Sequence, residues 1–199
     1  VLGAHVNQKG SLVNENETRF DFSHFAKVSD DEVKQIEKIV NEKIRENILL
    51  EARNNVPIKE AMDMGAMALF GEKYGDFVRV IIFDSKFSIE LCGGTHVSST
   101  GQIGLFKIVS EGAVAAGVRR IEGITAVKAE AYIDQQNSEL NALKELLKNP
   151  NDTVKRVQEL LDENAALQKQ IEQFTSEKTQ QVKRIMLDRR PHYSWRPPG

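Results

Sequence analysis

The sequence predicts an α+β fold, in which an antiparallel or mixed sheet with packed helices is followed by a long helical coiled-coil segment. Strand-like runs of alternating, β-branched or aromatic residues recur as far as residue 123, with helical apolar spacing between them. A heptad pattern appears after residue 151. We therefore expect a globular domain over residues 1–148, a coiled-coil arm over 149–187 and a disordered or non-native tail over 188–199.

Composition excludes several classes of protein. The chain of 199 residues is 40% hydrophobic and 28% charged, with a formal net charge of −2, which is ordinary for a soluble protein and gives no global sign of a nucleic-acid binder. A single cysteine excludes an internal disulfide framework and fits a reducing, cytoplasmic compartment. No run of about 18 apolar residues predicts a membrane span. Because Val1 is neither an initiator methionine nor part of a signal peptide, we expect a fragment.

The first 48 residues predict a hairpin and an amphipathic helix. Residues 5–13 and 18–23 alternate apolar and polar side chains, and the polar run 14–17 is the expected turn. Ser29 and Glu32 form a capping-box pattern, since the serine hydroxyl can accept from the Glu32 amide while Glu32 reaches back. The helix that follows has apolar residues spaced by three or four, namely Val33, Ile36, Val40, Ile44 and Ile48.

From residue 49 onward, short strands and helices are expected. Residues 49–56 are ambiguous and fit a short strand, and Pro57 can begin a helix that we expect over 58–70. The remaining expected elements are a hairpin of strands 77–83 and 87–91, a strand over 105–111, a small, flexible stretch over 112–117, a strand over 118–123, and a helix from 126 that ends at Asn149, Pro150 and Asn151.

A cysteine and a histidine four residues apart end the strand 87–91. Cys92 and His96 can bind one divalent ion, and zinc favours such mixed sulfur and nitrogen ligands. Gly93 and Gly94 between them let the backbone turn back. The alternative is a buried, inert cysteine beside a surface histidine in a glycine-rich turn. Because zinc sites usually take three or four protein ligands, this pair predicts half a site.

Two other groups of polar residues have both a functional and a structural interpretation. Residues of the first hairpin could face a pocket or simply be solvated: Gln8, Lys9, Ser11, Asp21 and His24. Arg119 and Arg120 follow the small residues 112–117, which could admit a ligand backbone or a phosphate. A surface turn with ion-paired arginines is the other interpretation, and the residues alone favour it.

The heptad pattern after residue 151 predicts a coiled-coil arm of about four heptads. Its two core positions hold Val157, Asn164, Ile171, Lys178 and Ile185, and Leu160, Leu167, Phe174 and Gln181. Asn164 is a candidate register-setting residue, and the arm can pair within the same chain or self-associate. The basic, proline-rich residues 188–199 fit either a disordered RNA-contacting tail or non-native sequence.

Four stretches together resemble the editing region of alanyl-tRNA synthetase, in that family's order and at comparable spacing. They run from His5 to Ser11, from Arg19 to His24, from Cys92 to His96 and from Gly117 to Glu122. The resemblance covers about residues 1–148, and the helical arm is similar to the start of the family's C-terminal region. It implies the fold of the threonyl and alanyl-tRNA synthetase second additional domain.

The resemblance implies a hydrolase that cleaves the ester bond of tRNA(Ala) wrongly charged with serine or glycine. A synthetic pocket built for a methyl group cannot fully reject these two amino acids, so a second site has to remove them. The family holds zinc through a His-x-x-x-His pair and a Cys-x-x-x-His pair. Cys92 and His96 match the Cys-x-x-x-His pair. The His-x-x-x-His pair is expected upstream of this chain, because His5 does not match either of its histidines. Gln8 and Thr95 are the implied catalytic residues: Gln8 positions the aminoacyl group or water, and Thr95 offers a hydroxyl beside the zinc ligands. The implied substrate-contacting residues are Gly93, Gly94, Arg119 and Arg120, the arginines through phosphates of the tRNA acceptor end.

The parent enzyme would ligate alanine to tRNA(Ala) with ATP, but the ATP-binding region is not in this sequence. Two of the family's four zinc ligands are present in this sequence. There are two alternative interpretations. One is a freestanding alanyl-tRNA editing protein, although the coiled-coil arm and the long intervening helices favour the synthetase. The other is a non-catalytic module that assembles through the heptads. The threonyl enzyme has a related fold, but Gly93, Gly94 and residues 119–122 fit the alanyl family better.

Overall fold

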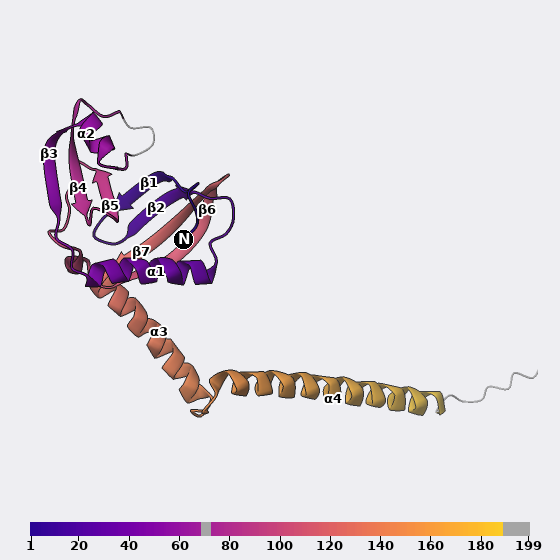
Figure 1. The fold of residues 1–199 in the computed structure, drawn as a ribbon. Coiled ribbons are helices and arrows are strands. Elements are labelled where there is room, and N and C mark those ends of the chain that lie inside the picture. Colours follow the sequence, from indigo (N-terminus) through magenta and orange to yellow (C-terminus); the bar gives the residue numbers. More distant parts are fainter. Residues whose placement is uncertain (69–72, 189–199) are drawn as a thin grey trace, which may run out of the picture. The chain divides into compact units, whose positions relative to one another are not determined.

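A computed structural model describes residues 1–68 and 73–188 of the chain (Figure 1). The chain forms two compact units, Val1–Gln136 and Asn137–Gly199, which we describe separately. The first unit is α+β, as expected, and its strands pair antiparallel in two sheets. Within the described residues, no helix is both long and apolar enough to cross a membrane.

The larger sheet has four strands in the order β1-β2-β7-β6. They are β1 (Gln8–Val13), β2 (Thr18–Ser23), β6 (Phe106–Ala115) and β7 (Val118–Thr125). Strand β7 pairs directly with β2, although about a hundred residues separate them in the sequence. Two of the four resembling motifs therefore lie side by side at the centre of this sheet, because Asp21 is the register partner of Arg120.

The smaller sheet has the order β3-β4-β5 and carries an apolar core. Its strands are β3 (Glu51–Pro57), β4 (Phe77–Phe83) and β5 (Ser88–Leu91), and α2 (Ile58–Asp63) packs against it. The buried residues of this core are Val56, Ala61, Ala66, Val78, Val80, Ile82 and Leu91. Alternation along β5 places Ile89 and Leu91 toward this core, which leaves Glu90 on the opposite face of the strand.

Helix α1 (Asp30–Arg45) begins at the predicted capping box, with both the Ser29 and Glu32 hydrogen bonds present. Its side chains also bind the outer edge of β6. Asn41 donates to the carbonyl of Phe106 and accepts from the Phe106 amide, each at 2.9 Å. The Glu37 carboxylate accepts from the Ile108 amide at 2.7 Å. An edge strand exposes unpaired backbone groups, so these bonds both anchor the helix and protect the edge.

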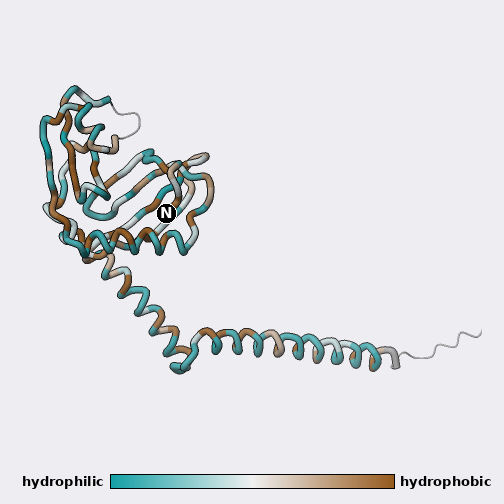
Figure 2. Tube along the Cα trace, in the orientation of Figure 1, coloured by the Kyte–Doolittle hydropathy of each residue, from teal (hydrophilic) through white to brown (hydrophobic). Residues whose placement is uncertain are grey.

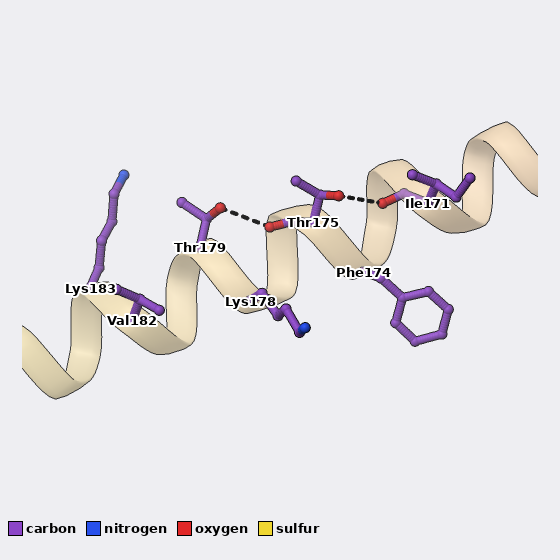
Figure 3. Close-up of a pocket in the computed structure, with 7 residues that line it drawn as sticks. All are labelled: Ile171, Phe174, Thr175, Lys178, Thr179, Val182 and Lys183. Carbon is purple, nitrogen blue, oxygen red and sulfur yellow. Dashed lines mark hydrogen bonds between the residues drawn. The ribbon is translucent and has the colours of Figure 1, made fainter.

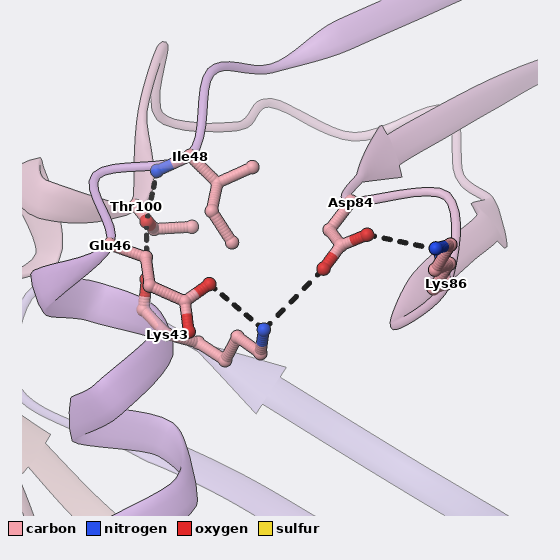
Figure 4. A network of polar contacts seen from close by, with 6 residues as sticks. All are labelled: Lys43, Glu46, Ile48, Asp84, Lys86 and Thr100. Carbon is pink, nitrogen blue, oxygen red and sulfur yellow. Dashed lines mark hydrogen bonds and ion pairs between the residues drawn. The ribbon is translucent and has the colours of Figure 1, made fainter.

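The end of α1 is tied to the smaller sheet by the polar network in Figure 4. The Lys43 ammonium lies 2.9 Å from the Glu46 carboxylate and 3.4 Å from that of Asp84, which follows β4. The Glu46 hydrogen bond raises the pKa of Lys43. Nearby, the Thr100 hydroxyl in the short 3₁₀ helix η1 (Thr100–Ile103) donates to the Lys43 carbonyl and accepts from the Ile48 amide. These contacts brace the loop that follows the Cys92 motif.

The structure corrects the limits of several expected elements. The ambiguous stretch 49–56 is confirmed as a strand, but β1 begins at Gln8 rather than at residue 5. The helix expected over 58–70 ends at Asp63, because Gly65 takes a φ of +83°, as expected for a residue that terminates a helix; residues 69 and 70 lie outside the described residues. The expected flexible stretch 112–117 is wrong over residues 112–115, where β6 pairs with β7, while residues 116 and 117 form the turn between the two strands. The predicted hairpin 77–91 is confirmed.

Two helices follow the last strand, α3 (Ala126–Leu146) and α4 (Thr153–Asp188), and the predicted break at Pro150 separates them. Figure 2 shows hydrophobic bands recurring along the otherwise hydrophilic α4. Its apolar side chains are exposed, with Ile171 64% and Phe174 66% accessible. In Figure 3 the Thr175 and Thr179 hydroxyls bond to carbonyls one turn earlier, at 2.7 and 2.8 Å. The long helix is confirmed, while its pairing in a coiled coil stays a prediction, and residues 189–199 of the expected tail lie outside the described residues.

Candidate functional site

The turn that carries Cys92 is an extension of the β4–β5 ladder. The Cys92 amide donates to the Arg79 carbonyl at 3.2 Å, one step beyond the last pair of the two strands. The Arg79 guanidinium then donates to the carbonyl of Gly94 at 2.5 Å and to that of Cys92 at 3.4 Å. Arg79 therefore holds the chain on both sides of Gly93, and the turn is fixed by a strand rather than by its own flexible glycines.

The other edge of β5 is bound by a single residue of the segment after α2. The Met67 amide donates to the Ile89 carbonyl at 2.8 Å, and the Leu91 amide donates to the Met67 carbonyl at 3.0 Å. Met67 thus pairs in parallel with Glu90. Because both edges of β5 are occupied at this point, the orientations of Glu90, Leu91 and Cys92 are well determined by backbone bonds.

A pocket of about 420 Å³ joins the two sheets at this place. It brings together Gln8 from β1 and Cys92 from the end of β5, two residues that sequence analysis had assigned to the site. The Gln8 side-chain amide donates to the Ser11 hydroxyl at 3.1 Å. The described residues that line the pocket are Val6, Asn7, Gln8, Ser11, Phe20, Met67, Ala68, Glu90, Leu91 and Cys92.

The other residues of the turn do not line this pocket. Gly93, Gly94 and Thr95 are exposed, and His96 is half-buried. The Nδ1 atom of His96 is buried without a hydrogen-bond partner. An unpaired buried nitrogen costs free energy, on the order of 1–3 kcal/mol. A bound metal ion would supply the missing partner, because neutral imidazole nitrogens are common metal ligands.

The donor types of this turn fit zinc, which binds thiolates and imidazoles. Their number is smaller than a zinc site needs: among residues 1–68 and 73–188, no three or more His, Cys, Asp or Glu side chains form a group that could hold a metal ion. Cys92 and His96 are therefore suited to be part of a metal site and not the whole of one.

The two predicted arginines are held by carboxylates of the same sheet. Arg119 makes a bidentate pair with Glu111 on β6, in which Nη2 lies 2.7 Å from Oε2. Arg120 makes a bidentate pair with Asp21 on β2, at 2.7 and 2.8 Å. The hydrogen bonds from these arginines lower the pKa of Glu111 and that of Asp21. This geometry is that of a structural brace, and contact between either arginine and tRNA stays a prediction.

Sequence reasoning missed three features near the site. The charged Arg79 lies within the apolar strand β4, and that contrast was an available signal. Glu90 lines the pocket, as strand alternation would have indicated. His5 and His24 stack with their ring centroids 5.1 Å apart, and His5 Nε2 lies 2.8 Å from His24 Nδ1. This imidazole pair depends on how the strand ends meet, which residue spacing does not give.

Comparison with known proteins identifies the relatives of this chain. Residues 78–122 match the family described as the threonyl and alanyl tRNA synthetase second additional domain. The chain is 61% identical over 188 residues to an alanine–tRNA ligase of Cytophaga hutchinsonii, which covers 94% of this chain and 21% of that protein. Alanine–tRNA ligases of Flavobacterium psychrophilum and Bacteroides fragilis are 55% and 54% identical over 187 residues, with the same coverage.

The matched region covers 94% of the chain, far more than the four resembling motifs alone. It agrees with the four resembling motifs, two of which meet at the centre of the larger sheet while Cys92 lies at the end of the smaller one. The chain spans about a fifth of the length of the curated relatives it matches, and on this likeness it belongs to the alanyl-tRNA synthetase family as a segment with an editing-type domain.

Proposed function

We propose that this segment is the editing part of an alanine–tRNA ligase and hydrolyses the ester bond of Ser-tRNA(Ala) and Gly-tRNA(Ala). The observation that carries the proposal is the convergence of Gln8 and Cys92 on one pocket, and the turn that begins at Cys92 also carries His96, whose buried Nδ1 has no hydrogen-bond partner. The pocket is bounded by apolar side chains and a few polar ones, which is the usual character of a small-ligand site. The whole enzyme ligates alanine to tRNA(Ala) with ATP bound outside this segment, in the cytoplasm.

Each residue has a distinct role in this proposal. Cys92 and His96 hold a zinc ion, with further ligands from outside the described residues. When bound, zinc acts as a Lewis acid that orients and polarises its ligands. The Gln8 amide orients the aminoacyl group or the attacking water, and its bond to Ser11 fixes its own position. Arg79 keeps the turn in place, and Thr95 offers an exposed hydroxyl next to His96.

The acceptor end of tRNA(Ala) is the proposed partner, with Gly93 and Gly94 allowing close approach of its backbone. Arg119 and Arg120 contact its phosphates only if their carboxylate pairs leave donor groups available. Each guanidinium carries five N–H donors, and a bidentate pair uses two of them, so such contact is compatible with the braces.

A second role is favoured by α4. Its exposed apolar side chains include Val157, Leu160, Leu167, Ile171 and Phe174, which follow the predicted heptad. We propose that this face packs in a coiled coil, either with another helix of the whole enzyme or with a second copy. Sedimentation over a range of concentrations separates these two arrangements.

The test of the editing proposal is deacylation of Ser-tRNA(Ala), with zinc content determined on the same samples. It is run on this chain, on a chain extended upstream to include the family's histidine pair, and on the Cys92→Ala variant of the extended chain. The extended chain should bind one zinc per molecule and release serine, while Cys92→Ala should lower that release by about 100-fold or more, since even residues that only support a metal ligand contribute about 10–100-fold.

Ser98→Ala is the matched control, because Ser98 is exposed and lies just outside the motif. Its serine release should equal that of the unsubstituted extended chain. A folded, zinc-loaded extended chain that leaves Ser-tRNA(Ala) intact would show that the segment is not a hydrolase, and the assembly role of α4 would then be the remaining proposal.

A further inference from the structure

The proposed pocket contains one acidic side chain whose role is unassigned. Glu90 lines it, and among the described lining residues Glu90 is the only carboxylate and no lysine or arginine is present. Its one hydrogen bond given by the structure is accepted by Oε1 from the Ser88 hydroxyl, at 3.2 Å. Glu90 is also in no ion pair among the described residues. Among the described residues, the pocket therefore holds a carboxylate that no lysine or arginine side chain pairs with.

The position of this carboxylate is set by the backbone on both sides. Glu90 is the register partner of Ile81 in β4, and Met67 pairs with it from the other edge. Ile89 and Leu91 pack into the core, so a strand in this register must direct Glu90 away from the core. Cys92 lies two residues further and lines the same pocket. The carboxylate and the thiol are thus fixed relative to each other by one short piece of strand.

An aminoacyl ester carries one group that such a site must recognise whatever its side chain. The α-amino group lies two bonds from the ester carbonyl carbon and is protonated below about pH 7.5. A charged ammonium that enters a partly enclosed pocket loses hydration and needs a negatively charged partner. Both serine and glycine esters present this group, whereas they differ in the side chain.

We infer that Glu90 binds the α-ammonium group of the esterified amino acid, and so places the ester carbonyl beside Cys92 and Gln8. This inference rests on the proposed function, because it names the part of the substrate that the pocket recognises. Recognition by Glu90 is independent of the amino-acid side chain, which explains how one pocket accepts both serine and glycine. The Ser88 hydroxyl holds one carboxylate oxygen and leaves the other for the ammonium.

The test compares two esters of tRNA(Ala) at about pH 6.5, where the amino group is protonated. One is Ser-tRNA(Ala), and the other is its 2-hydroxy analogue, in which a hydroxyl replaces the α-ammonium group. The enzyme is the intact synthetase that contains this segment. Glu90→Gln should lower kcat/KM for Ser-tRNA(Ala) by about 10–100-fold, the effect of losing a hydrogen bond to a charged group, and leave kcat/KM for the hydroxy analogue within about twofold. Glu90→Asp, which keeps the charge, should retain a preference for the seryl ester.

Glu130→Gln is the matched control, since Glu130 is an exposed carboxylate on α3 that does not line the pocket, and neither ester should respond to it. Equal losses on both esters in Glu90→Gln would make Glu90 a structural residue and overturn the inference. Unchanged rates on both esters would overturn it as well. If the unsubstituted synthetase fails to release serine, the editing proposal itself is wrong, which is a different outcome from either of these.

Discussion

The arginine pair on β7 and the turn 92–96 differ in how completely their polar groups are satisfied. Arg119 and Arg120 each meet a carboxylate in bidentate geometry, and the whole arrangement lies within one sheet. In the turn, Arg79 satisfies two carbonyls, but the buried Nδ1 of His96 has no partner. Arg19 Nε, on the brace side, is also buried without a hydrogen bond, but it lies 3.9 Å from the Asp21 carboxylate, whereas no ion pair of His96 is present among the described residues. An unpaired buried group requires an explanation, and for an imidazole beside a thiol a bound metal ion is one. The comparison separates a brace from a binding site.

The largest stability effect should come from breaking the brace between Glu111 and Arg119. The Glu111 side chain is only 8% exposed, and Glu111→Gln leaves the Arg119 charge without its counter-ion. We expect the free energy of unfolding to fall by about 2 kcal/mol, the contribution of hydrogen bonds to a charged group. Urea denaturation, followed by the NMR signals of the backbone amides of β6 and β7, measures this change in the free energy of unfolding.

Glu122→Gln is the matched control for that substitution, because it removes a carboxylate from the same pair of strands. Glu122 is bonded to the neutral Ser110 hydroxyl rather than to a cation, so its loss should cost about 0.5 kcal/mol or less. Equal losses of unfolding free energy in the two variants would show that the pair of Arg119 and Glu111 does not brace the sheet.

A smaller effect is expected from acid, acting on the same carboxylates. Arg119 lowers the pKa of Glu111, and Arg120 lowers that of Asp21. A carboxylate with a depressed folded pKa stabilises the fold above its unfolded pKa of about 4 and loses this contribution as the pH falls through the folded value. The free energy of unfolding should therefore decrease as the pH falls below about 5, and the decrease should be shallower in Glu111→Gln. Parallel curves for the two proteins would rule out Glu111 as a source of the acid sensitivity.

Much of the fold follows from local sequence. The capping box at Ser29, the hairpin 77–91 and the break at Pro150 were predicted because each depends on residues close together in the chain. Local propensity misled at residues 112–115, where small residues suggested flexibility but pairing with β7 imposes a strand. The premature end of α2 was predictable, since Gly65 is the kind of residue that terminates helices.

The site was only partly predictable for a physical reason. Cys92 and His96 are close in sequence, so their spacing already suggested a shared ligand. The meeting of Gln8 and Cys92 depends on how two sheets pack, and the bonds of Asn41 and Glu37 to the edge of β6 depend on the position of α1. No local pattern encodes such contacts. The family resemblance predicted a role for Gln8, and the structure then placed it in the pocket with Cys92. Glu90 was identified from the structure.

The central claim is that turn 92–96 is one half of a metal site, and zinc X-ray absorption on the intact, zinc-loaded synthetase tests it most directly. The spectrum should contain one sulfur ligand at about 2.3 Å, with nitrogen ligands at about 2.0–2.1 Å. Cys92→Ala should remove the sulfur, and His96→Ala should remove one nitrogen while the sulfur stays. A zinc spectrum without sulfur, or one that keeps its sulfur in Cys92→Ala, would contradict the account.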